Sequence, residues 1–162
     1  MGIFRYRQQV FTWKLDRDVQ VKLSIYGVDY KQTYLTMSPK GELHINKDYA
    51  WNGCSPKFEV FGMVFGTPEG SLPKDQEKQS ILKKLENLGY HDFDWRMPKT
   101  YYASLLHDSL YQISEKCSGQ MRRDKVDTIF YQILRAYNFF PAPFYYQAVK
   151  YFGRHYWGRK GT

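Results

Sequence analysis

The amino-acid sequence predicts an α+β fold, in which a small N-terminal antiparallel β-sheet precedes a helical region built on an antiparallel pair of helices. Residues 19–25 alternate apolar and polar side chains at period two, which is typical of a half-buried strand. From residue 75 onward, apolar residues recur at the spacing of amphipathic helices. The length of 162 residues suits a single domain, with a β-rich part at 1–48, a turn and loop segment at 49–74 and a helical part at 75–162.

The β-rich part is predicted to form a meander of short strands. Asp16–Arg17–Asp18 is the predicted turn between the first two, and glycine and proline separate the later ones. His44 would be an exposed strand residue, not a ligand. Residues 57–74 are spaced by Gly and Pro and indicate a loop or short strand. The predicted strands cover residues 10–15, 19–25, 34–37 and 42–45.

The helical part contains four predicted helices. Gly89 is a suitable C-terminal stop for the first, and Pro98 suits the approach to the second. Arg122 and Arg123 stand at the start of the third, where a positive charge opposes the helix dipole. They indicate either a contact with an anion or a loosely solvated turn. The predicted helices cover residues 74–88, 99–116, 122–137 and 144–153.

The second and third helices carry the strongest candidates for chemistry. His107 and Tyr111 are four residues apart and share a helix face, whereas Asp108 is turned by roughly 100° toward another neighbour. If the third helix packs antiparallel, Asp127 lies about one side chain from His107, as in a general base with its orienting carboxylate. Asp108 is then left for a cation. The competing interpretation is a half-buried histidine without catalytic use.

Two further segments contain oxygen ligands. Residues 48–56 form a compact turn segment whose side-chain and backbone oxygens could meet Asp108. His91 stands between Asp92 and Asp94, but that cluster lies in a linker without additional ligands, so we expect no metal there.

Four motifs carry a resemblance to known families. They are WNGCSP at 51–56, HDxxY at 107–111, VDxxFY at 126–131 and YYQAVKYFG at 145–153. In order and spacing they resemble the bacterial and fungal secreted phospholipase A2 family, over roughly the C-terminal two thirds of the chain. Over nearly its whole length the chain also resembles a family of unknown function found in phage and bacterial genomes.

The resemblance to phospholipase A2 implies a mechanism. His107 would deprotonate a water molecule, Asp127 would orient the imidazole, and Tyr111 would support the site by hydrogen bonding. A Ca²⁺ ion would polarise the ester carbonyl and stabilise the oxyanion. Its protein ligands would be Asp108, Asn52 and the carbonyl of Gly53. No other cofactor is implied.

The chain departs from the phospholipase pattern at two sites. Asn52 replaces the usual Asp, which removes a negative charge and lowers the expected affinity for Ca²⁺. Ser104 stands where the secreted enzymes have the disulfide partner of the cysteine at Cys54. Both cysteines are therefore expected to be free thiols, although a bridge between Cys54 and Cys117 stays open at this point.

The composition limits the partners and the compartment. A formal charge of +8 favours an anionic partner, such as a phospholipid surface, a nucleic acid or an acidic protein, or else indicates a solvated basic surface. No specific nucleic-acid motif is present, and no apolar run reaches the ~18 residues of a membrane span. Residues 1–7 lack the pattern of a signal peptide. We expect a cytoplasmic or phage-virion protein that is not an integral membrane protein.

Two functions follow from the sequence. The first is a phage-encoded, phospholipase A2-like, Ca²⁺-assisted ester hydrolase whose His–Asp dyad activates water. The second is a non-enzymatic structural or accessory phage protein, associated with the virion or tail and with other virion proteins, that keeps a weakened site. The joint presence of the dyad, its tyrosine and Asp108 favours the hydrolase, whereas Asn52 and the lack of a secretion signal favour the structural protein.

Overall fold

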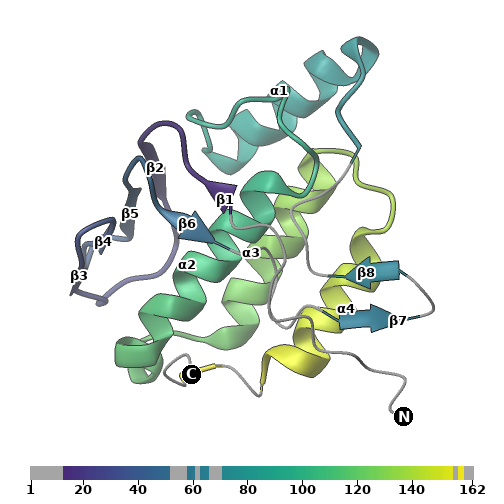
Figure 1. Ribbon diagram of the computed structural model, residues 1–162. Coiled ribbons are helices and arrows are strands. Elements are labelled where there is room, and N and C mark those ends of the chain that lie inside the picture. Colours follow the sequence, from purple (N-terminus) through teal and green to yellow (C-terminus); the bar gives the residue numbers. More distant parts are fainter. Residues whose placement is uncertain (1–12, 52–57, 61–62, 66–70, 155–156, 159–162) are drawn as a thin grey trace.

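The computed structural model describes residues 13–51, 58–60, 63–65, 71–154 and 157–158. Within this part of the chain, small antiparallel sheets and four α-helices form a mixed α+β fold, which confirms the predicted class (Figure 1). The strands lie at one side of the helices, and a separate hairpin lies at the other. None of the helices described is long and apolar enough to cross a membrane.

The four-stranded sheet has the order β2-β5-β4-β3, with every neighbouring pair antiparallel. Its inward side chains alternate with outward ones, as the period-two pattern of β2 predicts: Val19 and Val21 are buried, and the residues after each are exposed. His44 is half-buried on β5. The strands are β2 (Val19–Lys22), β3 (Tyr30–Lys31), β4 (Leu35–Met37) and β5 (Glu42–Ile45).

The predicted meander is wrong at its first strand. β1 (Trp13–Lys14) pairs with β6 (Ala50–Trp51) and not with β2, and β2 pairs with β5. The backbone of Leu15 exchanges two hydrogen bonds with residues 48 and 49. The Asp18 carboxylate accepts a 2.7 Å hydrogen bond from the Lys47 N–H. Residues 16–18 therefore form a corner held by a distant segment instead of a hairpin turn.

The segment predicted as a turn followed by loop or short strand contains short strands. Besides β6, it includes the antiparallel hairpin of β7 (Phe58–Val60) and β8 (Met63–Phe65).

The last three helices lie within two residues of their predicted bounds, whereas the first begins at residue 78 instead of 74. The four helices are α1 (Lys78–Leu88), after a 3-10 turn at Asp75–Glu77, α2 (Tyr101–Cys117), followed by a 3-10 turn at Ser118–Gln120, α3 (Arg123–Ala136) and α4 (Ala142–Gly153). Gly89 ends α1 with a φ of 82°, a left-handed conformation that glycine adopts without strain.

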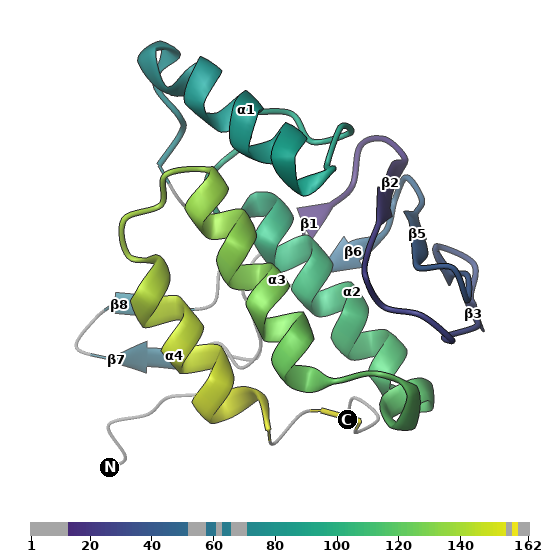
Figure 2. The ribbon, with the colours of Figure 1, turned by 180° about the vertical axis from the view of Figure 1, so that it is seen from behind.

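Helix α2 is the centre of the molecule, because thirteen of its seventeen residues are buried. Helix α3 runs beside it and α4 packs on α3, as Figures 1 and 2 show. At one end, Tyr102 of α2 stacks on Tyr137, just after α3; further along, Tyr111 contacts Asp127 in the second turn of α3. The two helices are therefore antiparallel, as the sequence predicts.

Candidate functional site

His107 and Asp127 meet in the interface between α2 and α3. The imidazole Nε2 lies 3.0 Å from the Asp127 Oδ1, which is hydrogen-bonding distance, and each side chain is 1% exposed. With an ionised carboxylate, Nε2 is the donor and the basic lone pair lies on Nδ1. The rings of Tyr111 and Phe130 pack against the imidazole and restrict its rotation. The geometry is that of a histidine held in one tautomer by a carboxylate.

Tyr111 is the second donor to the same carboxylate oxygen. Its hydroxyl donates a 2.8 Å hydrogen bond to the Asp127 Oδ1. Burial, followed by the neighbouring Asp127 charge, raises the pKa of Tyr111, so its hydroxyl stays protonated across the physiological range. Trp157 packs edge-on against the Tyr111 ring, at 5.1 Å between centroids. One oxygen of Asp127 thus receives two donors from one face of α2.

The other oxygen of Asp127 faces Arg123, one turn earlier on α3. The Arg123 Nη1 lies 3.5 Å from the Asp127 Oδ2 but donates its hydrogen bond to the Lys150 carbonyl at 3.0 Å. The buried Oδ2 has no hydrogen-bond partner within the described residues. Arg123 therefore supplies charge compensation to Asp127 without a direct hydrogen bond. Arg122 pairs instead with the exposed Asp124.

Gly153, the last residue of the YYQAVKYFG motif and of α4, packs directly against this cluster. A Cβ atom at this position would overlap the Tyr111 hydroxyl, lie 3.2 Å from its Cζ and lie 3.4 Å from the Arg123 Nη1. Only a residue without a side chain lets α4 approach this closely. Sequence reasoning identified the motif but not this role of its glycine.

Asp108 lies on a different side of α2, as expected from its angular offset. It belongs to the same line of side chains as Ser104 and Gln112, which are each one turn away. Ser104 accepts a 3.1 Å hydrogen bond from the Trp51 indole, and Gln112 accepts one of 3.0 Å from the Tyr49 hydroxyl.

The charge of Asp108 also affects the pKa of Tyr49. Burial first, and then the Asp108 carboxylate, raises the pKa of Tyr49. This line of α2 therefore faces the segment around β6 while His107 faces α3. Helix α2 therefore directs His107 and Asp108 toward two different parts of the molecule.

The remaining predicted Ca²⁺ ligands, Asn52 and Gly53, lie outside the described residues, as does Cys54. Cys117 is a buried free thiol. In the described ranges, no three His, Cys, Asp or Glu side chains are grouped so that they could hold a metal ion, the His91 cluster included. Asp108 is half-buried, and Ser104, one helical turn before it, accepts the hydrogen bond from Trp51 of β6. A carboxylate, an amide and a main-chain carbonyl are hard oxygen ligands, whose chemistry fits Ca²⁺.

A wide surface hollow lies away from the dyad. It measures about 810 Å³ and is lined by Arg17 and by residues 91–96 of the linker before α2, together with Lys78. Its carboxylates are already engaged: Asp94 binds Arg96, which lowers the pKa of Asp94, and Asp92 accepts a hydrogen bond from the Gln20 N–H. His107, by contrast, is 2% exposed.

Any functional assignment depends on the geometry of this site, because comparison with known proteins identifies no relative. Searches against protein-family models, curated proteins and solved structures find no match. Sequence reasoning missed the roles of Gly153 and Ser104, because both residues act through contacts between segments far apart in the chain.

Proposed function

We propose that this protein is a phospholipase A2-like, Ca²⁺-assisted hydrolase of an ester bond in a lipid. The observation that carries the proposal is the buried contact between the His107 Nε2 and the Asp127 Oδ1 at 3.0 Å. It lies in an antiparallel helix pair that also places Asp108 one residue away on another face. A helix pair needs no such arrangement for packing alone, since apolar side chains would fill the same interface at lower cost.

The proposed reaction begins with proton transfer to the free nitrogen of His107. Asp127 holds Nε2–H, so Nδ1 accepts a proton from the attacking water, and the ionised carboxylate stabilises the imidazolium that forms. Tyr111 keeps the carboxylate in place through its own hydrogen bond. The proton on Nδ1 is then available to the leaving alcohol as the tetrahedral intermediate collapses.

Asp108, Asn52 and the Gly53 carbonyl would hold the Ca²⁺ ion. When bound, the ion would polarise the ester carbonyl and balance the charge of the oxyanion. The contact that supports this grouping is the hydrogen bond from Trp51 to Ser104, because Asn52 directly follows Trp51 and Ser104 stands one helical turn before Asp108. In the secreted phospholipases that this chain resembles, the cysteine at the position of Ser104 forms a disulfide with the one at the position of Cys54, which also links this turn segment to the helix.

The test is fatty-acid release from mixed phospholipid vesicles, with Ca²⁺ and with a chelator. His107→Ala should abolish release, and Tyr111→Phe should reduce it. His91→Ala is the matched control, because this histidine is exposed in the linker, and it should leave release unchanged. The proposal fails if properly folded wild-type protein releases no fatty acid at any Ca²⁺ concentration, or if His107→Ala is as active as the wild type.

A second candidate is the non-enzymatic phage structural or accessory protein. The observation that favours it is the 2% exposure of His107, since a fully buried histidine–aspartate pair also serves to join two helices. In that case the chain would release no fatty acid. The His107→Ala variant would then show its effect in the free energy of unfolding and in the assembly of particles.

A further inference from the structure

We propose that the outer face of α4, together with Phe140 in the turn before it, is a binding surface for membranes that contain anionic phospholipid. This surface, called the aromatic face below, consists of Phe140, Phe144 and Tyr151. Their exposed fractions are 95%, 76% and 59%. The proposal does not depend on hydrolase activity, because it concerns attachment and not turnover.

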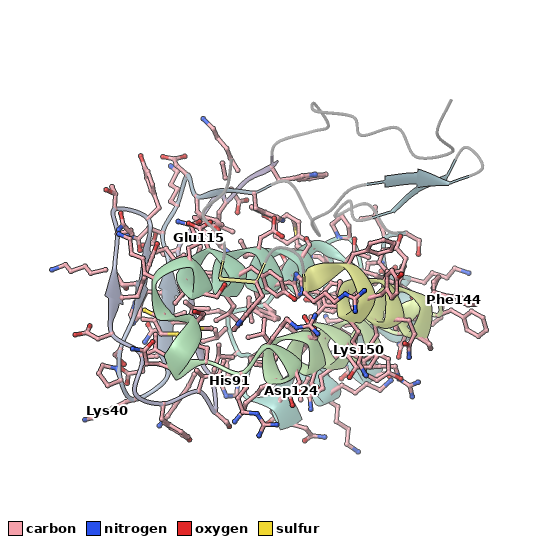
Figure 3. The ribbon with its side chains drawn as sticks, turned by 90° about the horizontal axis from the view of Figure 1, so that it is seen from below. Lys40, His91, Glu115, Asp124, Phe144 and Lys150 are labelled. Carbon is pink, nitrogen blue, oxygen red and sulfur yellow. The ribbon has the colours of Figure 1, made fainter. Side chains whose placement is uncertain are left out.

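The aromatic face follows the geometry of the helix. Phe144 precedes Tyr151 by seven residues, so these two side chains share one side of α4, and Phe140 lies in the turn two residues before the helix begins. The opposite side is used for packing, with Val149 and Gly153 buried. Figure 3 shows Phe144 pointing away from the body of the molecule. Phe140 and Phe144 are the two most exposed large apolar side chains in the described part of the chain.

The part of the chain that contains the aromatic face carries charge of a single sign. All 16 acidic residues of the chain lie at or before Asp127, and residues 128–162 contain five Lys and Arg with no Asp or Glu. Two of these cations flank the aromatic face: Arg154 lies over the Tyr151 ring at 5.0 Å, and Lys150 lies over the Tyr146 ring at 5.2 Å. On a helix, Lys150 and Arg154 are turned by roughly 80–120° from Phe144, at the edge of the aromatic face.

This arrangement matches a lipid surface better than a nucleic acid. A helix that lies in the plane of a membrane buries an apolar stripe among the headgroups and keeps its cations beside it, where they meet anionic lipid. Phenylalanine exposes no hydrogen-bonding group toward phosphates or base edges. In a nucleic-acid interface we would expect cations along the centre of the contacting face, since phosphate contacts supply most of the affinity.

The experiment is flotation of the full-length protein with vesicles made of ether-linked lipids, which an ester hydrolase does not cleave. One set contains only phosphatidylcholine and a second contains phosphatidylglycerol as well. We expect binding to the anionic vesicles, weakened by salt, and little binding to the neutral ones. The double variant Phe140→Ser/Phe144→Ser should lose at least about tenfold in vesicle affinity, given the apolar area of two phenylalanines. Lys150→Glu/Arg154→Glu should lose the preference for anionic lipid.

The matched control is Tyr26→Ser/Tyr34→Ser, which removes two exposed aromatic side chains, 63% and 48% accessible, from the region of the small sheet. It should bind vesicles as the wild type does. The proposal is overturned if folded wild-type protein does not float with anionic vesicles at low salt, or if the control loses as much binding as Phe140→Ser/Phe144→Ser. It is also overturned if a random-sequence RNA binds through the same residues and vesicles do not. Absence of fatty-acid release would refute the hydrolase and leave this result unaffected.

Discussion

Replacing Gly153 with alanine tests whether α4 supports the dyad through direct contact. The new methyl group would overlap the Tyr111 hydroxyl and crowd the Arg123 guanidinium. Overpacking of this kind costs about 1–3 kcal/mol, and alanine returns up to about 1 kcal/mol of helix propensity. Displacement of the Tyr111 hydroxyl also weakens its charge-assisted bond to Asp127, worth about 1.5–3 kcal/mol. We expect a net loss of about 1–3 kcal/mol in the free energy of unfolding.

The assay is urea denaturation followed by circular dichroism, with two comparisons. Gly119→Ala is the matched control, because a Cβ there meets nothing within 4 Å, and its stability should be equal to or slightly above that of the wild type. The second comparison repeats Gly153→Ala in a Tyr111→Phe background, where the clashing oxygen is absent. There the cost should shrink, giving a coupling energy above about 1 kcal/mol.

Equal costs of Gly153→Ala in both backgrounds would refute the reasoning, because the clash would not involve the Tyr111 hydroxyl. A Gly153→Ala variant as stable as Gly119→Ala would refute it as well.

Three further predictions concern the dyad, its arginine and the buried tyrosines. Asp127→Asn should lower fatty-acid release by about three to four orders of magnitude, as a wrong imidazole tautomer does in other histidine–aspartate sites, and an active Asn variant would exclude the dyad. Arg123→Met should lower the free energy of unfolding by about 1–3 kcal/mol, because it leaves the buried carboxylate uncompensated. Arg122→Met should change it by less than about 0.5 kcal/mol, because the Arg122 side chain is 78% exposed. Equal effects of the two substitutions in urea denaturation would contradict this. Burial raises the pKa of Tyr90 to about 12. The unfolded chain therefore loses its phenolic proton first, and stability should fall as pH rises from about 10 toward 12, by up to about 2–3 kcal/mol from this group, which denaturation at a series of pH values would detect.

The helices were predictable from the sequence because their signals are local. Periodic apolar residues, a glycine stop at Gly89 and a proline at residue 98 predict four helices, and all their ends except the start of α1 lie within two residues of the observed ones. The distance between His107 and Asp127 also follows from such local rules, once a short connection makes the two helices antiparallel neighbours. Helix phase alone then directs Asp108 away from α3.

The parts that sequence reasoning missed depend on contacts between distant segments. Nothing near residue 13 specifies that β1 pairs with β6 instead of the adjacent strand, because the choice rests on hydrogen bonds from Leu15 to residues 48 and 49. The closeness of Gly153 to Tyr111 and the bond from Trp51 to Ser104 are likewise tertiary. The unfavourable position of Arg123 was a usable signal, since an arginine that opposes its own helix dipole needs another partner.

Helix α4 connects the two proposals while keeping them separable. Its inner side, at Gly153, contacts the tyrosine that holds the dyad, and its outer side carries Phe144, with Phe140 in the turn before the helix. Because the two sides share no side chain, a clash at Gly153 should disturb the hydrogen bonds of Asp127 without removing the exposed rings. Gly153→Ala should therefore reduce fatty-acid release while it still floats with anionic vesicles, at temperatures where it is folded. Phe140→Ser/Phe144→Ser should show the opposite result. It should hydrolyse soluble, monomeric ester substrates as the wild type does, but it should no longer float with anionic vesicles.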